Sequence, residues 1–448
     1  MKLTITAIFS LLSIHSLFAQ WSELGGLNGL AANGLINTVC TDAAGNVYAA
    51  GNFYNGSNNR YVAKFDGNSW SELGGVNALA ANNGIYSIAA DATGNIYATG
   101  FSNSSGKFYV AKFDGTTWSE LGGVNALSGN SWIATLAIDA AGKVYAAGNI
   151  TNPSGNHYVA EFDGSIWKEL GGSNTLAANN TIRSICTDSA GNIYAAGRFT
   201  NAYGNRYVAK YSTGAWSELG GPNSLTVNNE ILAVCADSAG NVYVAGSFTN
   251  SSGNGYVAQF KNNAWSELGG FNALAANGII LSISSDASGN IYASGNFTNA
   301  SGNFYVAKYD GNSWSEVGGL NSLAAGGNIK AICTDATGNV YAGGYFTNAA
   351  FNKYVAKYAI PTGTTFLSAG NGLLVYPNPA TNELFVECKG FNVERIQIYD
   401  ILGKLCTVYS QAGKKAAALD ISKLTPGLYF IQLLSSAGEI RTFRIAKE

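Results

Sequence analysis

Seven aspartates at matching positions are the residues whose type and spacing most readily suggest shared chemistry. They stand 48 or 49 residues apart, each at the start of a turn that ends in Gly-Asn or Gly-Lys: Asp42, Asp91, Asp139, Asp188, Asp237, Asp286 and Asp335. A ring of carboxylates could hold a cation, although the spacing is not that of an EF-hand loop. Alternatively, each carboxylate could accept N–H bonds within its own turn. Because an aspartate occurs at every turn, we favour the turn interpretation and expect no metal or other cofactor.

Imidazole chemistry has little support, because His157 is the only histidine beyond the N-terminal apolar segment that contains His15. Ser-His-Asp and Cys-His catalysis need a positioned imidazole, and many zinc sites need several. Cleavage of polysaccharides needs two carboxyl groups with separated pKa values, and Glu230 is the one acid outside the repeat pattern on the expected ligand face. We therefore expect no enzyme, keep a polysaccharide-acting enzyme as the alternative, and place His157 in an exposed loop.

Seven tryptophans share the same spacing within a recurring element of the form Trp-Ser-Glu-Leu-Gly-Gly: Trp21, Trp70, Trp118, Trp167, Trp216, Trp265 and Trp314. Such rings could stack on sugars, but their recurrence at one strand position indicates packing between repeats. Trp132 is the only tryptophan outside this series, and it precedes the first strand of its repeat. A fixed period of about 40–50 residues built from short strands predicts a β-propeller.

Each repeat contains four predicted strands, which we place in the fourth unit at 182–188, 193–199, 207–211 and 216–219. No stretch has a sustained helical period, so helices should be absent or trivial. The chain begins with the fourth-strand element at Trp21, whereas the last set of strands lacks a fourth. Residues 21–26 should therefore pair with 354–358 and remove the exposed sheet edges. The sequence predicts an all-β fold, a seven-bladed propeller over residues 20–358 that the N-terminal strand closes.

The run Gly-x-Phe-Thr-Asn, followed by Tyr-Val-Ala-Lys-Tyr-Asp-Gly-x-Ser-Trp-Ser-Glu-Leu-Gly, resembles kelch and galactose-oxidase-type propeller repeats of secreted surface proteins. The Asp-x-x-Gly-Asn-x-Tyr turn is similar to that of bacterial secreted propeller repeats. Both resemblances cover about residues 20–358 and imply a fold rather than a function, since propellers host many unrelated activities.

One position of the repeat varies while its neighbours barely change. It follows a recurring isoleucine and is occupied in turn by Asn37, Tyr86, Ala134, Arg183, Leu232, Leu281 and Lys330. We call these seven residues the variable column. In a propeller this position lies where a long loop enters the innermost strand, by the channel mouth. Freedom from packing constraint would explain the variation. The sharper hypothesis is an asymmetric recognition surface made of Tyr86, Trp132, His157, Arg183, Tyr203, Arg206 and Lys330.

Two further substitutions between repeats predict contacts. The third strand carries lysine in most units but Glu161 in the third, and that unit alone places a lysine, Lys168, after its tryptophan. The paired exchange predicts that the two are cross-strand neighbours.

Four cysteines, Cys40, Cys186, Cys235 and Cys333, share one first-strand position. We expect small buried residues there, with disulfides between neighbouring units as the alternative. Cys388 and Cys406 could pair in the C-terminal domain.

The two ends of the sequence carry features that predict the protein's localisation. Residues 1–19 are typical of a secretory signal peptide, with Lys2, an apolar stretch and a cut expected before Gln20. No later segment reaches about 18 apolar residues, so we expect no transmembrane segment. The whole chain has a net charge of −2 and only 12% charged residues, which does not favour nucleic acid as a partner.

After a linker at 359–373 the repeat is lost, and residues 374–448 contain short predicted strands at 383–387, 395–399, 404–409, 416–419, 427–433 and 441–445. This alternation predicts a small β-sandwich. The motif residues are Tyr376, Pro377, Asn378, Pro379, Gly403, Gly427, Tyr429 and Lys447. With their neighbours they resemble the type A C-terminal sorting domain of the type IX secretion system in Bacteroidetes. The resemblance implies Sec export, then recognition of residues 374–448 by the type IX machinery, and removal of this domain with release or surface attachment of the propeller. A generic C-terminal binding sandwich is the alternative.

Together these patterns predict a monomeric binding or scaffold module that is secreted or held on the outer-membrane surface. Its ligand would be a glycan or another protein. The alternatives are the polysaccharide-acting enzyme and a purely structural surface protein, which near-identical repeats would suit.

Overall fold

The computed structural model describes residues 21–270, 273–319, 322–359, 373–376, 379–388, 393–400, 403–414, 416–435 and 440–447. The predicted signal peptide at 1–19 and the linker residues 360–372 lie outside this range. Contacts divide the described chain into two compact units, with the boundary between Ile360 and Pro361. Each unit is treated by itself.

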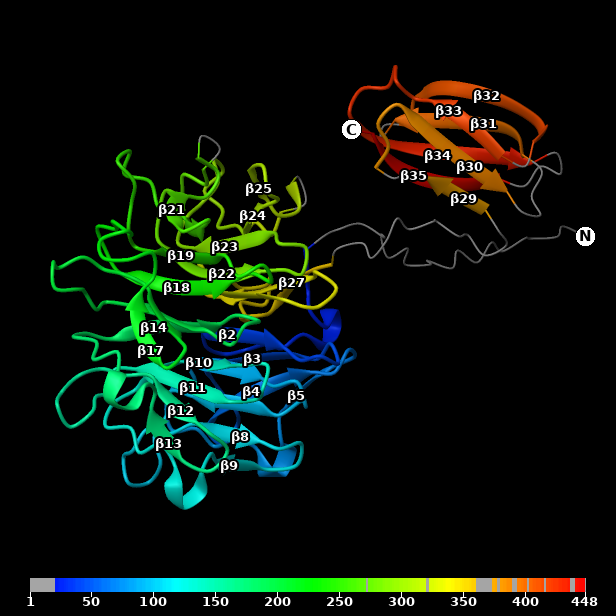
Figure 1. The fold of residues 1–448 in the computed structure, drawn as a ribbon. Coiled ribbons are helices and arrows are strands. Elements are labelled where there is room, and N and C mark those ends of the chain that lie inside the picture. The colour runs from blue at the N-terminus through cyan, green and yellow to red at the C-terminus, as the bar shows by residue number, and fades with distance from the viewer. Residues whose placement is uncertain are drawn as a thin grey trace, which may run out of the picture. The chain divides into compact units, whose positions relative to one another are not determined.

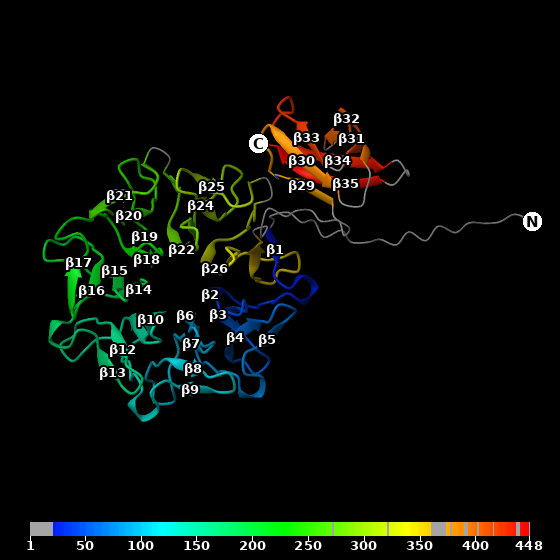
Figure 2. The same cartoon turned by 45° about the vertical axis from the view of Figure 1, so that its right-hand side comes forward.

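Four-stranded antiparallel sheets, seven in the described part of the first unit, make up the propeller. Figure 2 shows them as blades around a central axis, with the first strand of each blade innermost. Blade 1 contains β2 (Ile36–Thr41), β3 (Val47–Tyr54), β4 (Arg60–Phe65) and β5 (Trp70–Glu72). Blade 2 contains β6 (Ser87–Ala90), β7 (Ile96–Thr99), β8 (Ala111–Phe113) and β9 (Trp118–Glu120). Blade 3 contains β10 (Ile133–Ile138), β11 (Val144–Gly148), β12 (Ala160–Phe162) and β13 (Trp167–Glu169).

The remaining blades repeat this order. Blade 4 contains β14 (Ile182–Thr187), β15 (Ile193–Gly197), β16 (Ala209–Ser212) and β17 (Ala215–Glu218). Blade 5 contains β18 (Ile231–Ala236), β19 (Val242–Gly246), β20 (Ala258–Lys261) and β21 (Ala264–Glu267). Blade 6 contains β22 (Ile280–Ser285), β23 (Ile291–Gly295), β24 (Ala307–Tyr309) and β25 (Trp314–Glu316). Blade 7 contains β26 (Ile329–Thr334), β27 (Val340–Gly344), β28 (Ala356–Tyr358) and the N-terminal β1 (Trp21–Glu23). The strands predicted in the fourth unit match these within about two residues.

The N-terminal strand closes the ring as predicted. β1 pairs antiparallel with β28, placing Trp21 opposite Tyr358 and Glu23 opposite Ala356. The Trp21 indole is 7% exposed, and its N–H donates to the backbone oxygen of Val317 in blade 6 at 3.0 Å. The strand therefore completes blade 7 and also joins it to blade 6.

The same indole bond links every neighbouring pair of blades. The N–H of each recurring tryptophan donates to a backbone oxygen of the preceding blade at 2.9–3.1 Å: Trp70 to Leu24, Trp118 to Leu73, Trp167 to Leu121, Trp216 to Leu170, Trp265 to Leu219 and Trp314 to Leu268. Each ring also packs on an aromatic residue of its own blade, with centroids 5.3–5.6 Å apart. Packing between blades, rather than sugar stacking, accounts for these seven residues.

The recurring aspartates hold the turns between the first two strands of each blade. In blade 4, Asp188 Oδ1 accepts the backbone N–H groups of Ala190 and Asn192, while Oδ2 accepts the Asn192 amide and the Tyr194 hydroxyl at 2.7 and 2.9 Å. Burial alone would raise the pKa of Asp188, but these hydrogen bonds lower it overall. The carboxylate is thus saturated within its own blade, as the turn interpretation predicted.

Glu161 and Lys168 are cross-strand partners, as predicted. Their charged atoms lie 3.7 Å apart. A third residue, Lys143, was missed: its Nζ lies 2.7 Å from the same carboxylate. Other blades carry asparagine at the position of Lys143, so blade 3 differs by a set of three charges that compensate one another around a carboxylate only 7% exposed.

Single 3₁₀ turns follow the outermost strands of several blades, among them η1 (Gly26–Asn28), η2 (Gly75–Asn77), η3 (Gly123–Asn125) and η4 (Gly172–Asn174). Each starts from a glycine with positive φ, such as Gly25 at 93°. No described helix is long and apolar enough to cross a membrane.

The C-terminal unit is a β-sandwich of two sheets, shown in orange and red in Figure 1. One sheet orders β29 (Leu373–Tyr376), β30 (Glu383–Cys388) and β33 (Ala416–Asp420). The other orders β32 (Leu405–Lys414), β31 (Val393–Asp400), β34 (Gly427–Ser435) and β35 (Ile440–Lys447). Leu384, Ile396, Ile398 and Ile431, each 0% exposed, lie in the core between them. The six predicted strands are present, whereas β29 was not predicted and begins inside the expected linker.

The sorting-motif residues take structural roles where the structure describes them. Gly403, with φ of 79°, forms the turn that returns the chain to Asp400. Tyr429 is 6% exposed, and its hydroxyl donates to the Thr425 carbonyl at 2.8 Å. Gly427 begins β34 and pairs with Lys447, Pro379 is exposed, and Tyr376 ends β29. Pro377 and Asn378 lie outside the described residues.

Deleting residues 20–26 should lower the melting temperature of the propeller by far more than a surface change, because blade 7 loses its outer strand and the Trp21 bond to blade 6. Differential scanning calorimetry would measure the effect. The matched control is Leu27→Ser, at a side chain that is fully exposed. Equal melting temperatures for the deletion and the wild type would rule out closure by β1.

Glu161→Lys should lower the melting temperature by a few degrees, because three ammonium groups would then meet in blade 3. Adding Lys143→Asn and Lys168→Ser should restore it, since that triple variant has the residues of the other blades. If the melting temperature of the triple variant stayed as low as that of Glu161→Lys, the three charges would not compensate one another.

Candidate functional site

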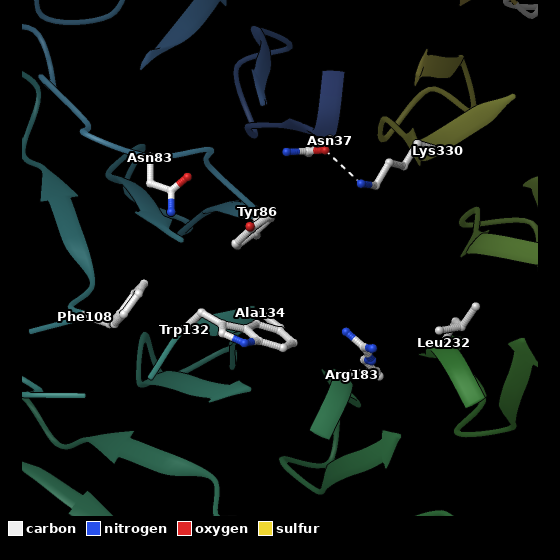
Figure 3. A pocket seen from close by; sticks show the side chains of 9 residues that line it. All are labelled: Asn37, Asn83, Tyr86, Phe108, Trp132, Ala134, Arg183, Leu232 and Lys330. Carbon is white, nitrogen blue, oxygen red and sulfur yellow. Dashed lines mark hydrogen bonds between the residues drawn. The ribbon is translucent and has the colours of Figure 1, made fainter. Parts of the chain in front are cut away.

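The channel mouth holds a cavity of about 400 Å³ where the variable column of six blades converges. Its lining residues are Asn37, Asn83, Tyr86, Phe108, Trp132, Ala134, Arg183, Leu232 and Lys330. Figure 3 shows Tyr86, Trp132, Arg183 and Lys330 directed toward one central space from four different blades. Among the variable-column residues, Leu281 of blade 6 alone is not part of the lining.

A β-bulge explains why the variable column is free to vary. In six blades the pairing of the first two strands shifts at this residue, as between Ile182 and Ser184 in blade 4. The residue between them, Arg183 there, has no partner in the strand ladder. Its side chain can therefore turn into the channel without disturbing the blade. Bulges often re-aim a side chain at a functional site.

Two aromatic rings and a guanidinium form one wall of the cavity. Tyr86 and Trp132 meet edge to face, with centroids 6.1 Å apart and planes at 64°. The guanidinium carbon of Arg183 lies 5.3 Å from the Trp132 ring centroid, in a cation–π contact. Tyr86 is 40% exposed and Trp132 is half-buried. The wall is thus a polarised aromatic surface open to solvent.

Arg183 is only partly neutralised. Its Nε lies 3.7 Å from Glu230 Oε2, and the same carboxylate accepts a hydrogen bond from Arg198 of Arg183's own blade. The Arg183 Nε is buried and has no hydrogen-bond partner. Burial lowers the pKa of Arg183, while Glu230 acts in the opposite direction. Two guanidiniums therefore share one carboxylate.

Lys330 has no acidic partner among the residues that line the cavity. Its Nζ donates to Asn37 Oδ1 at 2.9 Å. The amide of Asn37 is fixed in turn by bonds to the Ile85 carbonyl and Asn52 Oδ1, at 3.0 and 3.2 Å. Burial lowers the pKa of Lys330. A neutral amide thus positions a partly desolvated ammonium group.

The recognition surface predicted from the sequence is only partly assembled in one place. Tyr86, Trp132, Arg183 and Lys330 line the cavity, whereas His157, Tyr203 and Arg206 do not belong to its lining. Tyr203 is 74% exposed on the loop between β15 and β16.

His157 and Arg206 sit where neighbouring blades meet. The backbone of His157 bridges to Ala178 of the next loop, and Arg206 bridges in the same way to Val227. His157 is half-buried, and its Nε2 lies 3.1 Å from Asn149 Oδ1. Burial lowers the pKa of His157. The prediction that it occupies an exposed loop is wrong, because this column of the repeat joins blades.

Sequence reasoning did not assign five of the lining residues to the site: Asn37, Asn83, Phe108, Ala134 and Leu232. Asn37, Ala134 and Leu232 carried a signal, since all three belong to the variable column. Phe108 shares its repeat position with His157 and Arg206, and this second variable position could have revealed it. Asn83 lies in a loop that the repeat comparison does not single out.

Glu230, the acid considered for catalysis, belongs to a recurring contact between blades. Two residues that are 32 positions apart face each other across the interface between neighbouring blades. Where both are polar they form a hydrogen bond, as Arg198 does with Glu230. Thr181 donates to Asn149 at 2.8 Å, and Asn328 donates to Asn296 at 2.8 Å. Glu230 therefore has a structural partner in its own blade interface.

The described cysteines are free thiols: Cys40, Cys186, Cys235, Cys333 and Cys406. Burial raises the pKa of Cys235 to about 12, which keeps this thiol protonated and unreactive. The disulfide alternative between blades is therefore not realised. The Cys388 side chain lies outside the described residues.

Comparison with known proteins identifies the C-terminal unit. Residues 374–446 match the family described as the secretion system C-terminal sorting domain. This domain marks the protein for type IX export to the cell surface or for secretion. The match covers the sandwich. No protein of curated function matches the sequence.

Among solved structures, the chain is similar to the extracellular domain of a protein described as a hybrid two-component system from B. thetaiotaomicron. The TM-score is 0.51 at 14% identity, over 93% of this chain and 55% of that one. A second extracellular domain from the same organism, described as part of a one-component system, gives a TM-score of 0.48 at 13% identity, over 96% and 57%. The chain spans little more than half the length of either. The first similarity supports the propeller fold.

Replacing Lys330 by glutamine should raise the melting temperature at neutral pH, because the fold disfavours the charged amine while glutamine can still donate to Asn37. The difference should disappear as the pH rises from the lowered pKa of Lys330 toward that of an ordinary lysine, since the amine is then neutral in both states. Calorimetry of Lys330→Gln beside the exposed Lys261→Gln would measure it. A lower melting temperature for Lys330→Gln alone would contradict the desolvation of this amine.

Proposed function

We propose that the protein is a binding module, secreted or held at the cell surface, whose propeller takes a glycan at the channel mouth. The observation that carries this proposal is the aromatic wall of Tyr86 and Trp132 facing two cationic side chains in one cavity. Ligand sites are concave, mainly apolar and supplied with a few convergent polar groups. Aromatic rings beside hydrogen-bond donors suit the apolar faces and hydroxyl rims of sugar rings.

The variable column supports the same proposal. Near-identical blades need no diversity for packing, yet they place tyrosine, arginine, lysine, asparagine and leucine at one repeat position around the mouth. A purely structural ring would not require that asymmetry. Protein ligands fit the cavity less well than a sugar, because a space of about 400 Å³ admits only a side chain or a chain end.

We propose further that the protein is not an enzyme. Sugar cleavage needs two carboxyl groups on either side of the bond, and none of the described residues that line the cavity is acidic. Glu230 stands behind Arg183 and is shared with Arg198. Export would begin with removal of residues 1–19 through the Sec route, and residues 374–448 would then engage the type IX machinery. The resemblance of the repeats to the kelch type and the monomeric state remain predictions.

A glycan array probed with the full mature chain tests the proposal. Trp132→Ala and Tyr86→Ala should each weaken binding about tenfold or more, since a lost aromatic contact is worth about 1–2 kcal/mol. Tyr203→Ala is the matched control, because this exposed tyrosine lies outside the cavity. Binding that survives both cavity variants would place the site elsewhere. If the wild type binds no glycan, the glycan proposal is wrong.

A further inference from the structure

The charge at the channel mouth is opposite in sign to that of the chain. The protein carries 25 basic and 27 acidic residues and a net charge of −2. The cavity nevertheless presents two cations, Arg183 and Lys330, and no acidic residue belongs to its described lining. Clefts lined by charge of one sign concentrate ligands of the opposite sign. A neutral sugar could accept hydrogen bonds from these side chains but would not use their charge.

Both cations are short of anionic partners. Lys330 donates to a neutral amide oxygen, and Arg183 shares Glu230 with Arg198. The Arg183 Nε is buried with no hydrogen bond, although it faces Glu230 at 3.7 Å. Burying a charge without a close, hydrogen-bonded counter-charge is unfavourable. An anionic ligand would supply the counter-charge that the fold does not provide. Its binding would therefore be more favourable here than at an exposed lysine.

The two cations are placed to act on one ligand. Arg183 comes from β14 of blade 4 and Lys330 from β26 of blade 7, and Figure 3 shows both end groups turned toward the space in front of Trp132 and Tyr86. The Arg183 guanidinium contacts the Trp132 ring, with its carbon 5.3 Å from the ring centroid. A flat guanidinium offers parallel N–H groups that match a carboxylate or a sulfate. Asn37 fixes the direction of the Lys330 ammonium.

We infer that the ligand is an acidic saccharide, whose carboxylate or sulfate groups pair with Arg183 and Lys330 from two sides of the cavity while a sugar ring packs on the Tyr86 and Trp132 wall. This inference rests on the proposed function and narrows its ligand class. Carboxylate and sulfate share the chemistry that the two cations recognise. The choice between uronic acids and sulfated sugars is left to experiment.

Matched pairs of oligosaccharides test the inference on the unaltered full chain, using isothermal titration calorimetry. One pair is oligogalacturonate and its methyl ester, and the other is a sulfated galactan oligomer and its desulfated form. In at least one pair the acidic member should bind about tenfold tighter or more than its neutral partner, a gap of about 1.4 kcal/mol. The pair that shows the gap identifies the acidic group.

Variants assign that preference to the two cations. Arg183→Gln and Lys330→Gln should each remove most of the difference in affinity between the acidic and the neutral member of the pair. Trp132→Ala should weaken both members, and the exposed Lys261→Gln should change neither. Melting temperatures recorded in parallel exclude unfolding, and the ligand comparison on the wild type requires no variant.

Two results would overturn the inference in distinguishable ways. Equal binding of acidic and neutral members, lost in Trp132→Ala, would leave a glycan site that does not select acids. Absence of binding to any saccharide, with binding of a short acidic peptide instead, would remove the proposed function together with the inference. An acidic preference that survives Arg183→Gln and Lys330→Gln would place the anion contact away from these residues.

Discussion

The structure depends on one repeated constraint: each of the seven blades must pack against the preceding blade, so that the ring closes. The indole N–H bond from each recurring tryptophan to the preceding blade meets this requirement, and Trp21 makes the bond from the N-terminal strand that completes blade 7. Because every interface is built alike, most positions of the repeat are fixed by the same packing. A position of the repeat can vary only in two cases. Either its residue is unpaired between the strands, as at a bulge, or its contact residue is substituted together with it.

Those two conditions separate structural from functional diversity. Structural positions vary in matched sets, as with Arg198 and Glu230 between blades or the Lys143, Glu161 and Lys168 cluster within blade 3. The variable column differs, since bulge residues such as Arg183 and Lys330 need no partner of their own and point into the channel mouth. The Lys330 ammonium is partly buried beside a neutral amide, and a buried charge of this kind weakens the fold rather than strengthens it, which is typical of sites maintained for binding.

The fold could be predicted in some detail because the repeat period, the strand alternation and the unmatched ends are properties of the sequence. The variable column was also visible, and it supplied Tyr86, Arg183 and Lys330. The physical basis of its variation was not visible in the sequence, because a β-bulge has no signature in a repeat whose first two strands look regular. His157 was misplaced and Phe108 missed for a related reason. Their shared position looks like loop sequence, yet its backbone bridges two blades. The contact of Arg183 with Trp132 joins β14 of blade 4 to the residue before β10 of blade 3, and no other blade has a tryptophan at that position, so spacing could not reveal it.

The central claim is that a ligand occupies the channel mouth against Trp132, with its charge held by residues of opposite blades. A crystal structure of the full chain with its tightest-binding saccharide tests that claim most directly. The account predicts a sugar ring against the Tyr86 and Trp132 wall, with an acidic group within hydrogen-bonding distance of Arg183 and Lys330. A saccharide bound on the turns of the opposite face, or on the outer rim of a blade, would contradict it.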